Sequence, residues 1–129
     1  MSTEIVRSAY EGFAQGNIPA VLALIAPDCE WIETEAQGIP TRGVHRGPAG
    51  VAEGVFSKVP ENFNEFALHP ERFIESGDLV LVTGRVKGQS KAGRSLDAPF
   101  AHVFLISDGL IARLENYHDT ALWLEALHA

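Results

Sequence analysis

The chain has 129 residues, of which 46% are hydrophobic, and its 10 basic and 17 acidic side chains give a formal net charge of −7. This length and composition indicate one folded core, so we expect a single domain over residues 1–129. The acidic balance argues against a nucleic-acid partner, which requires clustered lysine and arginine, and no apolar run is long enough to suggest a membrane partner.

The N-terminal part of the sequence predicts two helices. Residues 1–7 lack the basic-then-apolar pattern of a signal peptide. Apolar residues then follow the helical period over residues 3–15, and Gly16 ends this pattern. A second, short helix is expected to begin at Pro19 and to run through Ile25 before Pro27 ends it.

The next segment predicts one strand, a loop and a third helix. The strand is expected over residues 30–34, followed by an irregular loop over 36–47 and a helix from Pro48 to about Lys58. Cys29, the only cysteine, precedes the strand, and we expect a small buried side chain there rather than a reactive thiol. The absence of a second cysteine for a disulfide, together with the absence of a signal peptide, predicts a cytoplasmic protein.

From Phe63 onward the apolar pattern changes to the alternation of strands. Strands are expected over residues 66–74 with a bend at Pro70, and over 79–86, 96–106 and 110–118, with a polar hairpin end over 87–95 and a terminal helix over 120–127. Helices followed by a meander of antiparallel strands predict an α+β fold. We expect three N-terminal helices packed on a strongly curved sheet, which gives a cone with a pocket at its mouth.

The last expected hairpin is the most informative stretch of the sequence. Its two apolar runs flank Ser107, Asp108 and Gly109, which are turn residues. Three polar residues interrupt the runs on what is otherwise an apolar face: His102, Asn116 and His118. An apolar face with a few converging polar groups is typical of a small-molecule pocket, and we expect Trp31, Phe100 and Phe104 to contribute to its lining.

The order of elements resembles the nuclear transport factor 2-like superfamily, and the local match is closest to SnoaL-like, ketosteroid isomerase-related proteins. Tyr10, Phe13, Gly16 and Asn17 carry this resemblance, together with residues 31–33, 46–48, 53–56, 77–80, 98–104, 108–111 and 117–121. The similarity spans nearly the whole chain. It implies the cone-shaped fold, and it implies a homodimer that pairs through the exposed face of the sheet.

The resemblance also implies two catalytic residues. Glu33 lies near the position of the carboxylate base of ketosteroid isomerase, and burial would raise the pKa of such a carboxyl toward neutrality. The alternative for Glu33 is a solvated carboxylate at a strand end, for which Glu35 is equally well placed. His102 stands seven residues before Gly109, where SnoaL-like cyclases carry an active-site histidine. The alternative for His102 is a core histidine bonded to the backbone.

Asn116 departs from the family pattern. The cyclases carry an acid/base aspartate seven residues after the hairpin glycine, and this chain has an amide there, which hydrogen-bonds but does not transfer a proton at neutral pH. We therefore expect Asn116 to bind substrate, with His118 beside it. Asp119 is expected to cap the terminal helix instead.

Two functional hypotheses follow from these residues. The first is a cofactor-free isomerase, cyclase, dehydratase or hydrolase that acts on a small apolar substrate with a carbonyl group or a ring. Glu33 or His102 would be its base. The second is a ligand-binding or interaction domain of the same fold without chemistry. The histidine and glutamate spacings match no known metal-binding pattern, so we expect no metal.

Overall fold

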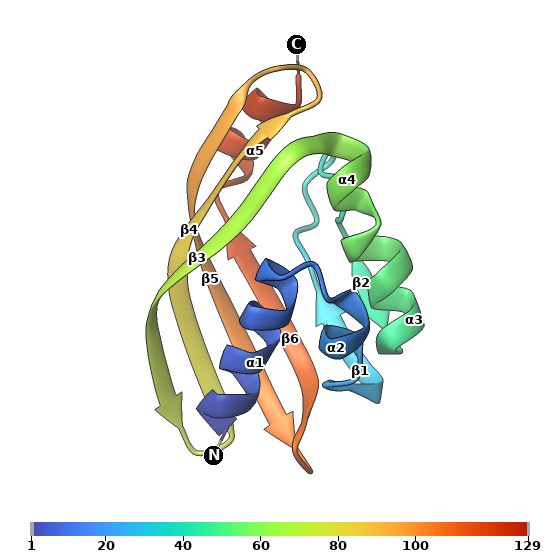
Figure 1. Cartoon of the computed structure of the whole chain (residues 1–129), viewed down its shortest axis with the longest axis vertical. Coiled ribbons are helices and arrows are strands. Elements are labelled where there is room, and N and C mark those ends of the chain that lie inside the picture. Colours follow the sequence, from blue (N-terminus) through green and yellow to red (C-terminus); the bar gives the residue numbers. More distant parts are fainter. Residues whose placement is uncertain (1, 129) are drawn as a thin grey trace.

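A computed structural model describes residues 2–128 and shows a mixed α+β fold (Figure 1). The helices are α1 (Ser2–Ala14), α2 (Ile18–Leu22), α3 (Gly47–Val51), the π-helical turn η1 (Ala52–Phe56), α4 (Lys58–Asn62) and α5 (Thr120–Leu127). The strands are β1 (Ile25–Ile32), β2 (Val44–Arg46), β3 (Phe63–Ser76), β4 (Leu79–Ser90), β5 (Ser95–Ser107) and β6 (Leu110–His118).

The six strands form one curved sheet in the order β2-β1-β6-β5-β4-β3. All neighbouring strands are antiparallel except β1 and β6, which pair in parallel. Figure 1 shows α1 lying across the concave face of the sheet, whereas α5 lies at the end opposite the N-terminus. This arrangement confirms the predicted α+β cone.

Side-chain alternation along β4 and β5 builds the core on the concave face. Val80, Val82 and Val86 of β4 are buried, and so are Phe100, His102 and Phe104 of β5, while the odd-numbered residues between them face outward. The inward side chains of the two strands therefore cover the same face, on which the helices pack.

The predicted bend of β3 at Pro70 is confirmed. Proline cannot donate to the ladder, and the β3–β4 register shifts between Pro70 and Arg72. Gly84 of β4 pairs with Pro70, and a Cβ atom at this position would collide with the carbonyl oxygen of His69. Glycine therefore allows the two backbones to approach closely where the sheet curves.

The first predicted strand was too short. β1 begins at Ile25, which the sequence placed in the second helix, and its register with β6 is irregular between Ile25 and Glu30. Pro27 lies in this irregular part, where a strand tolerates a residue without an N–H group. The loop predicted over 36–47 also contains a strand, β2, which pairs with the end of β1.

The third helix and one hairpin end also differ from the prediction. The segment from Pro48 to Lys58 divides into α3 and η1, and a Cβ atom at Gly54 would collide with the His45 ring. A wider helical turn with a glycine at this point accommodates the histidine. The polar stretch over 87–95 is mostly strand, because β4 continues to Ser90 and only residues 91–94 form the turn.

Three sequence-based expectations about single positions are confirmed. Asp108 and Gly109 both have positive φ angles, 53° and 75°, as the turn between β5 and β6 requires. The Asp119 side chain accepts a hydrogen bond from the Leu122 backbone N–H at 3.1 Å and caps α5. Cys29 is fully buried, and burial raises the pKa of its thiol to about 11. Within residues 2–128, every helix is too short or too polar to cross a bilayer.

Loss of the α5 cap should destabilise the fold. Asp119→Ala leaves the Leu122 N–H without its acceptor and should lower the free energy of unfolding by about 1 kcal/mol. Asp119→Asn should retain most of the stabilisation by the cap, because the asparagine oxygen also accepts from this N–H. Urea denaturation of the three proteins measures the difference. An alanine variant as stable as the parent would show that the cap contributes nothing.

Candidate functional site

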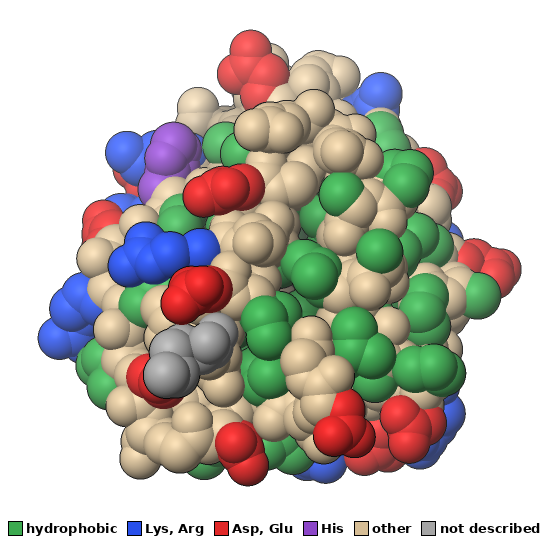
Figure 2. All heavy atoms as spheres, turned by 60° about the horizontal axis from the view of Figure 1, so that its bottom comes forward, with side chains coloured by type: hydrophobic (Ala, Val, Ile, Leu, Met, Phe, Trp, Pro, Cys, Tyr) green, Lys and Arg blue, Asp and Glu red, His purple; other side chains and the backbone are tan. Residues whose placement is uncertain are grey.

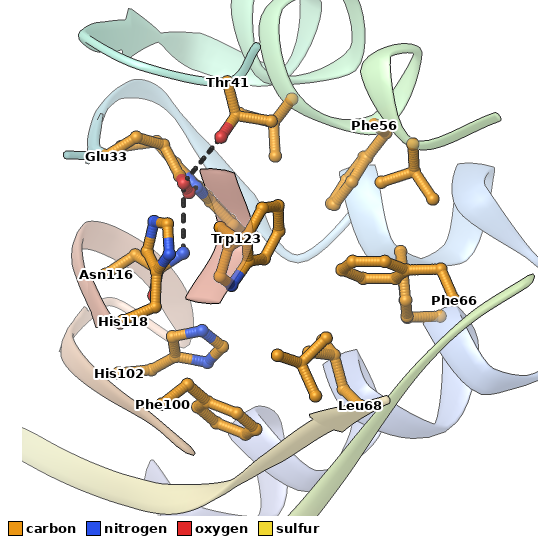
Figure 3. A pocket seen from close by; sticks show the side chains of 15 residues that line it. Glu33, Thr41, Phe56, Phe66, Leu68, Phe100, His102, Asn116, His118 and Trp123 are labelled. Carbon is orange, nitrogen blue, oxygen red and sulfur yellow. Dashed lines mark hydrogen bonds between the residues drawn. The ribbon is translucent and has the colours of Figure 1, made fainter. Parts of the chain in front are cut away.

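A cavity lies between the concave face of the sheet and the helices, at the end where α4 and α5 lie. Fifteen residues line it: Phe13, Trp31, Glu33, Thr41, Val55, Phe56, Val59, Phe66, Leu68, Val86, Phe100, His102, Asn116, His118 and Trp123. Figure 3 shows Phe56, Phe66 and Leu68 on one side of an open gap. The labelled polar side chains and Trp123 lie on the other side. The cavity offers about 60 Å³ to the centre of a water-sized molecule.

A second, entirely apolar cavity of about 50 Å³ continues toward α1. It shares five lining residues with the first cavity, namely Phe13, Trp31, Phe56, Leu68 and His102. Phe104, which was expected in the main pocket, lines only this inner cavity. The two cavities therefore form one apolar interior with polar groups at the outer end.

Glu33 supplies the carboxyl group of the polar end and is only 5% exposed. It follows the last residue of β1, and its backbone N–H bonds to the Gly43 carbonyl at 2.9 Å, which continues the strand pairing by one step. Because alternate residues face the same side, Glu33 points inward with Trp31. The competing possibility for this segment, Glu35, is exposed.

Three donors from separate segments bind the Glu33 carboxylate. Trp31 Nε1 donates to Oε2 at 2.7 Å, while Thr41 Oγ1 at 3.1 Å and Asn116 Nδ2 at 3.0 Å both donate to Oε1 (Figure 3). Burial raises the pKa of Glu33, and these three hydrogen bonds partly oppose the rise because they stabilise the charged form. The group is a desolvated carboxylate that is held in one orientation.

His102 lies on β5 directly opposite Asn116 of β6 and is 7% exposed. Its Nδ1 and the Tyr10 hydroxyl form a hydrogen bond of 2.6 Å, and its ring stacks on Phe100 with centroids 4.3 Å apart. Burial lowers the pKa of His102 to about 3, and the nearby His118 adds to this effect while Asn116 opposes it. The imidazole is therefore neutral at pH 7.

His118 and Trp123 form the wall contributed by β6 and α5. Their rings lie 4.6 Å apart between centroids, and Trp123 is 6% exposed. Burial lowers the pKa of His118 to about 4, although the Asp119 carboxylate acts in the opposite direction. Like His102, this imidazole is neutral at pH 7.

The charged groups of the cavity are few. Its lining contains no lysine and no arginine. Among residues 2–128, no three histidine, cysteine, aspartate or glutamate side chains lie close enough together to hold a metal ion. Glu33 is the one acidic side chain among the lining residues.

Comparison with known proteins identifies the family. A family model for the SnoaL-like domain matches residues 6–114. The chain belongs to the SnoaL-like family. This confirms the resemblance that the sequence motifs indicated.

Solved structures agree with this assignment. An NTF2-like protein of unknown function from Burkholderia pseudomallei is 31% identical, with coverage of 99% of this chain and 98% of the other and a TM-score of 0.93. TerC, crystallised with polyporic acid, is also 31% identical over the same shares, with a TM-score of 0.92. A putative SnoaL-like polyketide cyclase from Jannaschia is 19% identical over 99% and 92% of the chains, with a TM-score of 0.82, and shares the fold. A search among curated proteins found no match.

The SnoaL-like fold brings most of the predicted site residues together. Glu33 and His102 line one cavity, as do the four expected binding residues Trp31, Phe100, Asn116 and His118. Their roles in binding or catalysis remain predictions. Phe104 is the exception, since it lies in the inner cavity.

Sequence reasoning missed three residues of this SnoaL-like site. Thr41 lies in the stretch predicted to be irregular, and nothing in the sequence indicates that its hydroxyl reaches Glu33. Trp123 was expected on the terminal helix, but the pattern does not show that this helix turns its indole into the pocket. Tyr10 packs against the core, and nothing in the sequence shows that its hydroxyl also binds His102.

The two low histidine pKa values predict a pH-dependent stability. In the unfolded chain an imidazole takes up a proton near pH 6.5, whereas His118 in the folded chain does so only near pH 4. The stability that neutral His118 contributes is therefore complete above pH 6.5 and is lost as the pH falls toward 4. The raised pKa of Glu33 has the opposite effect, because it makes the folded state relatively more stable as the pH falls. A variant is therefore needed to measure the contribution of His118 alone.

Replacing His118 by phenylalanine should flatten this pH dependence. Between pH 7 and pH 5 the parent protein should lose about 1–2 kcal/mol more unfolding free energy than His118→Phe. Urea denaturation at both pH values gives the difference, with His69→Gln, which removes an exposed imidazole, as the matched control. Equal losses in the parent and in His118→Phe would contradict the expected burial of a neutral imidazole.

Proposed function

We propose that this SnoaL-like protein binds a small, largely apolar molecule with a ring and a carbonyl group, and that Glu33 moves a proton on it. One observation carries the proposal: a buried carboxyl group with a raised pKa stands at the polar end of an aromatic cavity. Proton transfer by a positioned side chain works best when the pKa of that side chain lies close to the working pH. The reaction would need no group beyond the side chains of the chain itself.

Glu33 suits the role of base better than His102. A base must accept a proton at the working pH, and burial lowers the pKa of His102 to about 3 while it raises that of Glu33. The carboxylate has about four lone-pair positions, and the three donors leave one for a substrate proton. We therefore assign the proton transfer to Glu33 and assign His102 to holding the substrate.

Asn116 supports this base directly. It was expected to bind substrate, and its amide nitrogen instead donates to Glu33. This contact orients the carboxylate and limits the rise of its pKa. An amide at this position fits a mechanism with one carboxylate base rather than the paired acid and base of the cyclases.

The substrate class rests on the cavity and on one relative. Six aromatic rings line the cavity, and flat apolar rings pack well against such walls: Phe13, Trp31, Phe56, Phe66, Phe100 and Trp123. TerC, at 31% identity, was crystallised with polyporic acid, so a small-molecule ligand suits this chain as well.

The assignment of Glu33 predicts a slower proton transfer in Glu33→Gln. Acetophenone, 1-indanone and 2-tetralone carry an acidic proton next to a carbonyl, and the parent protein should accelerate its exchange in D₂O, which proton NMR follows. Glu33→Gln should reduce the rate about 10²–10⁴-fold, because the amide does not accept the proton. Glu35→Gln, an exposed carboxylate two residues away, is the matched control and should keep the parent rate. A Glu33→Gln variant that exchanges the proton at the parent rate would show that Glu33 is not the base.

A binding protein without chemistry is the second candidate. The three hydrogen bonds on Glu33 favour it, because a carboxylate with three donors also serves to hold β1, the Thr41 loop and β6 together. In that case the three ketones would bind, would be recovered unchanged and would exchange at the rate seen in buffer alone. The exchange experiment therefore separates the two functions.

We also propose that two copies pair through the outer face of the sheet. The outward residues Ile74, Leu81 and Val103 lie in one row across β3, β4 and β5, beside Leu79 and Leu105 in the next row. Ile74 and Leu79 are each 46% exposed, and such a contiguous apolar face is typical of an interface. Ile74 and Leu79 lie near the β3–β4 turn, and this end of the molecule is the one turned forward in Figure 2.

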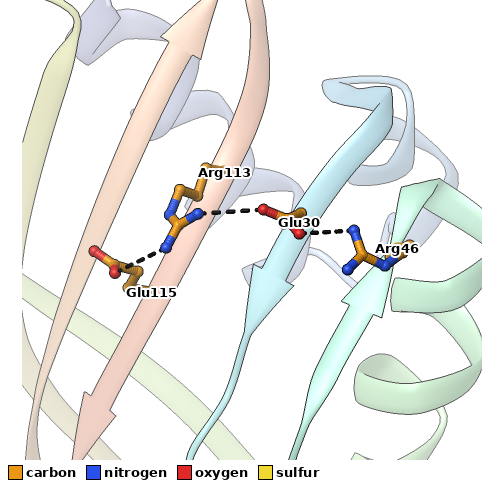
Figure 4. Close-up of polar contacts among 4 residues, drawn as sticks. All are labelled: Glu30, Arg46, Arg113 and Glu115. Atoms are coloured by element: carbon orange, nitrogen blue, oxygen red, sulfur yellow. Dashed lines mark hydrogen bonds and ion pairs between the residues drawn. The ribbon is translucent and has the colours of Figure 1, made fainter.

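An alternating row of charges continues the outer face beyond these apolar residues. Glu30 of β1 contacts Arg46 at 2.7 Å and Arg113 at 3.2 Å, and Arg113 also contacts Glu115 at 3.4 Å (Figure 4). The row lies on β2, β1 and β6, so the same face has an apolar half and a charged half. In a two-fold pair, this pattern restricts how the second copy is oriented.

The proposed pairing predicts that a charge within the apolar row dissociates the dimer. Leu81→Glu should convert the protein from dimer to monomer in size-exclusion chromatography with light scattering, because two carboxylates would be buried at the interface. Glu11→Gln on the exposed side of α1 is the control and should leave the mass unchanged. A parent protein that is monomeric at high concentration would refute the pairing.

A further inference from the structure

Four buried polar atoms lie without hydrogen-bond partners at one end of the cavity. They are Asn116 Oδ1, both ring nitrogens of His118 and Trp123 Nε1, and they are the complete set of buried unpartnered side-chain nitrogen and oxygen atoms in residues 2–128. All three residues line the main cavity. Buried polar atoms are normally paired, so a cluster of four in a cavity indicates that something else provides the partners.

The donor or acceptor character of these atoms is fixed by their surroundings. Asn116 donates its amide nitrogen to Glu33, which leaves its oxygen as a free acceptor. The indole nitrogen of Trp123 only donates. Because the pKa of His118 is lowered to about 4, its neutral ring offers one donor and one acceptor. The cluster thus presents two donors and two acceptors.

The same surroundings determine the charge of a suitable ligand. No lysine or arginine lines the cavity, and both histidines in it are neutral at pH 7. An anionic group would lose its hydration, gain no cation and face the Glu33 carboxylate. A cation would find one carboxylate that three donors already bind. The site therefore favours an uncharged ligand.

The unpartnered atoms are held in place by the junction of β6 and α5. His118 ends β6, Asp119 caps α5, and the Trp123 backbone N–H bonds to the Asp119 carbonyl at 3.1 Å. His118 and Trp123 are thus fixed with their rings in contact. In Figure 3 both side chains lie beside the gap, opposite Phe66 and Leu68.

We propose that Asn116, His118 and Trp123 form a hydrogen-bonding subsite for an uncharged ring compound that carries both a carbonyl and a hydroxyl group. The Trp123 indole N–H donates to the carbonyl, and the Asn116 oxygen accepts from the hydroxyl. The neutral His118 ring forms a further hydrogen bond, either as a donor to the carbonyl or as an acceptor from the hydroxyl. The subsite rests on the proposed function only in taking this cavity as the ligand site, and it holds whether or not Glu33 transfers a proton. It makes the C-terminal helix the element that selects the ligand.

A series of matched probes tests the subsite. The probes are 3′-hydroxyacetophenone and 4′-hydroxyacetophenone (carbonyl and hydroxyl), acetophenone (carbonyl only), ethylbenzene (neither) and benzoate (an anion). Dissociation constants are measured by NMR titration at about pH 7, where both hydroxyacetophenones are mostly uncharged. At least one hydroxyacetophenone should bind about tenfold or more tightly than ethylbenzene, acetophenone should lie between them, and benzoate should bind most weakly.

Variants assign the preference to the proposed residues. Trp123→Phe removes the donor and retains an aromatic ring, and it should weaken hydroxyacetophenone binding about five- to tenfold while changing ethylbenzene binding less than twofold. His118→Phe, which removes both ring nitrogens, should act in the same selective way and serves if Trp123→Phe does not fold. The dissociation constants of the parent, Trp123→Phe and His118→Phe test the subsite, whereas the deuterium-exchange rates of the parent and Glu33→Gln test the base. A failed subsite and a failed catalytic base are therefore distinguished.

Four results would overturn the proposal, and three of them concern the pattern of affinities. They are ethylbenzene binding as tightly as the hydroxyacetophenones, benzoate binding most tightly, and equal losses for all probes in both Trp123→Phe and His118→Phe. Absence of binding by every neutral probe at millimolar concentration would also overturn it.

Discussion

The Glu33 carboxylate and its three donors hold the functional end of this protein together. Trp31 and Thr41 lie close to it along the chain, but Asn116 lies 83 residues away, on β6. A buried carboxylate is costly unless hydrogen bonds compensate for its lost hydration. The donors come from β1, from β6 and from the loop that precedes β2. The packing that buries the carboxylate therefore also fixes the positions of these three segments.

The aromatic interior and the polar end depend on each other. Burial by aromatic side chains raises the pKa of Glu33, and the same burial lowers the pKa values of His102 and His118. The apolar environment therefore leaves a weak carboxylic acid next to two neutral imidazoles. Neutral histidines donate and accept hydrogen bonds without attracting anions, so the interior selects ligands by shape and hydrogen bonding more than by charge.

The sequence was sufficient to predict the fold and the strands that carry the site. The β5–β6 hairpin shows why: its turn residues and apolar runs predict both strands. The observed register shifts between Leu105 and Ile106, and this shift places His102 opposite Asn116. Glu33 was placed by the resemblance to ketosteroid isomerase, because the strand period allowed Glu35 equally well. What the sequence could not supply were contacts across irregular backbone. Thr41 reaches Glu33 from a loop, and Trp123 enters the cavity through the rotation of a short helix, and neither contact has a periodic signal.

The parallel pairing of β1 with β6 has a consequence for how the protein is made. β3 to β6 form a meander of neighbours in the sequence. β1 pairs with the nearby β2 on one side, but its partner on the other side, β6, lies more than eighty residues downstream. Contacts at such separation form late, because a long loop must close first. During synthesis α1, α2 and β1 leave the ribosome early but have no β6 on which to dock. The cavity, and with it the buried state of Glu33, therefore forms only after β6 and α5 have been made.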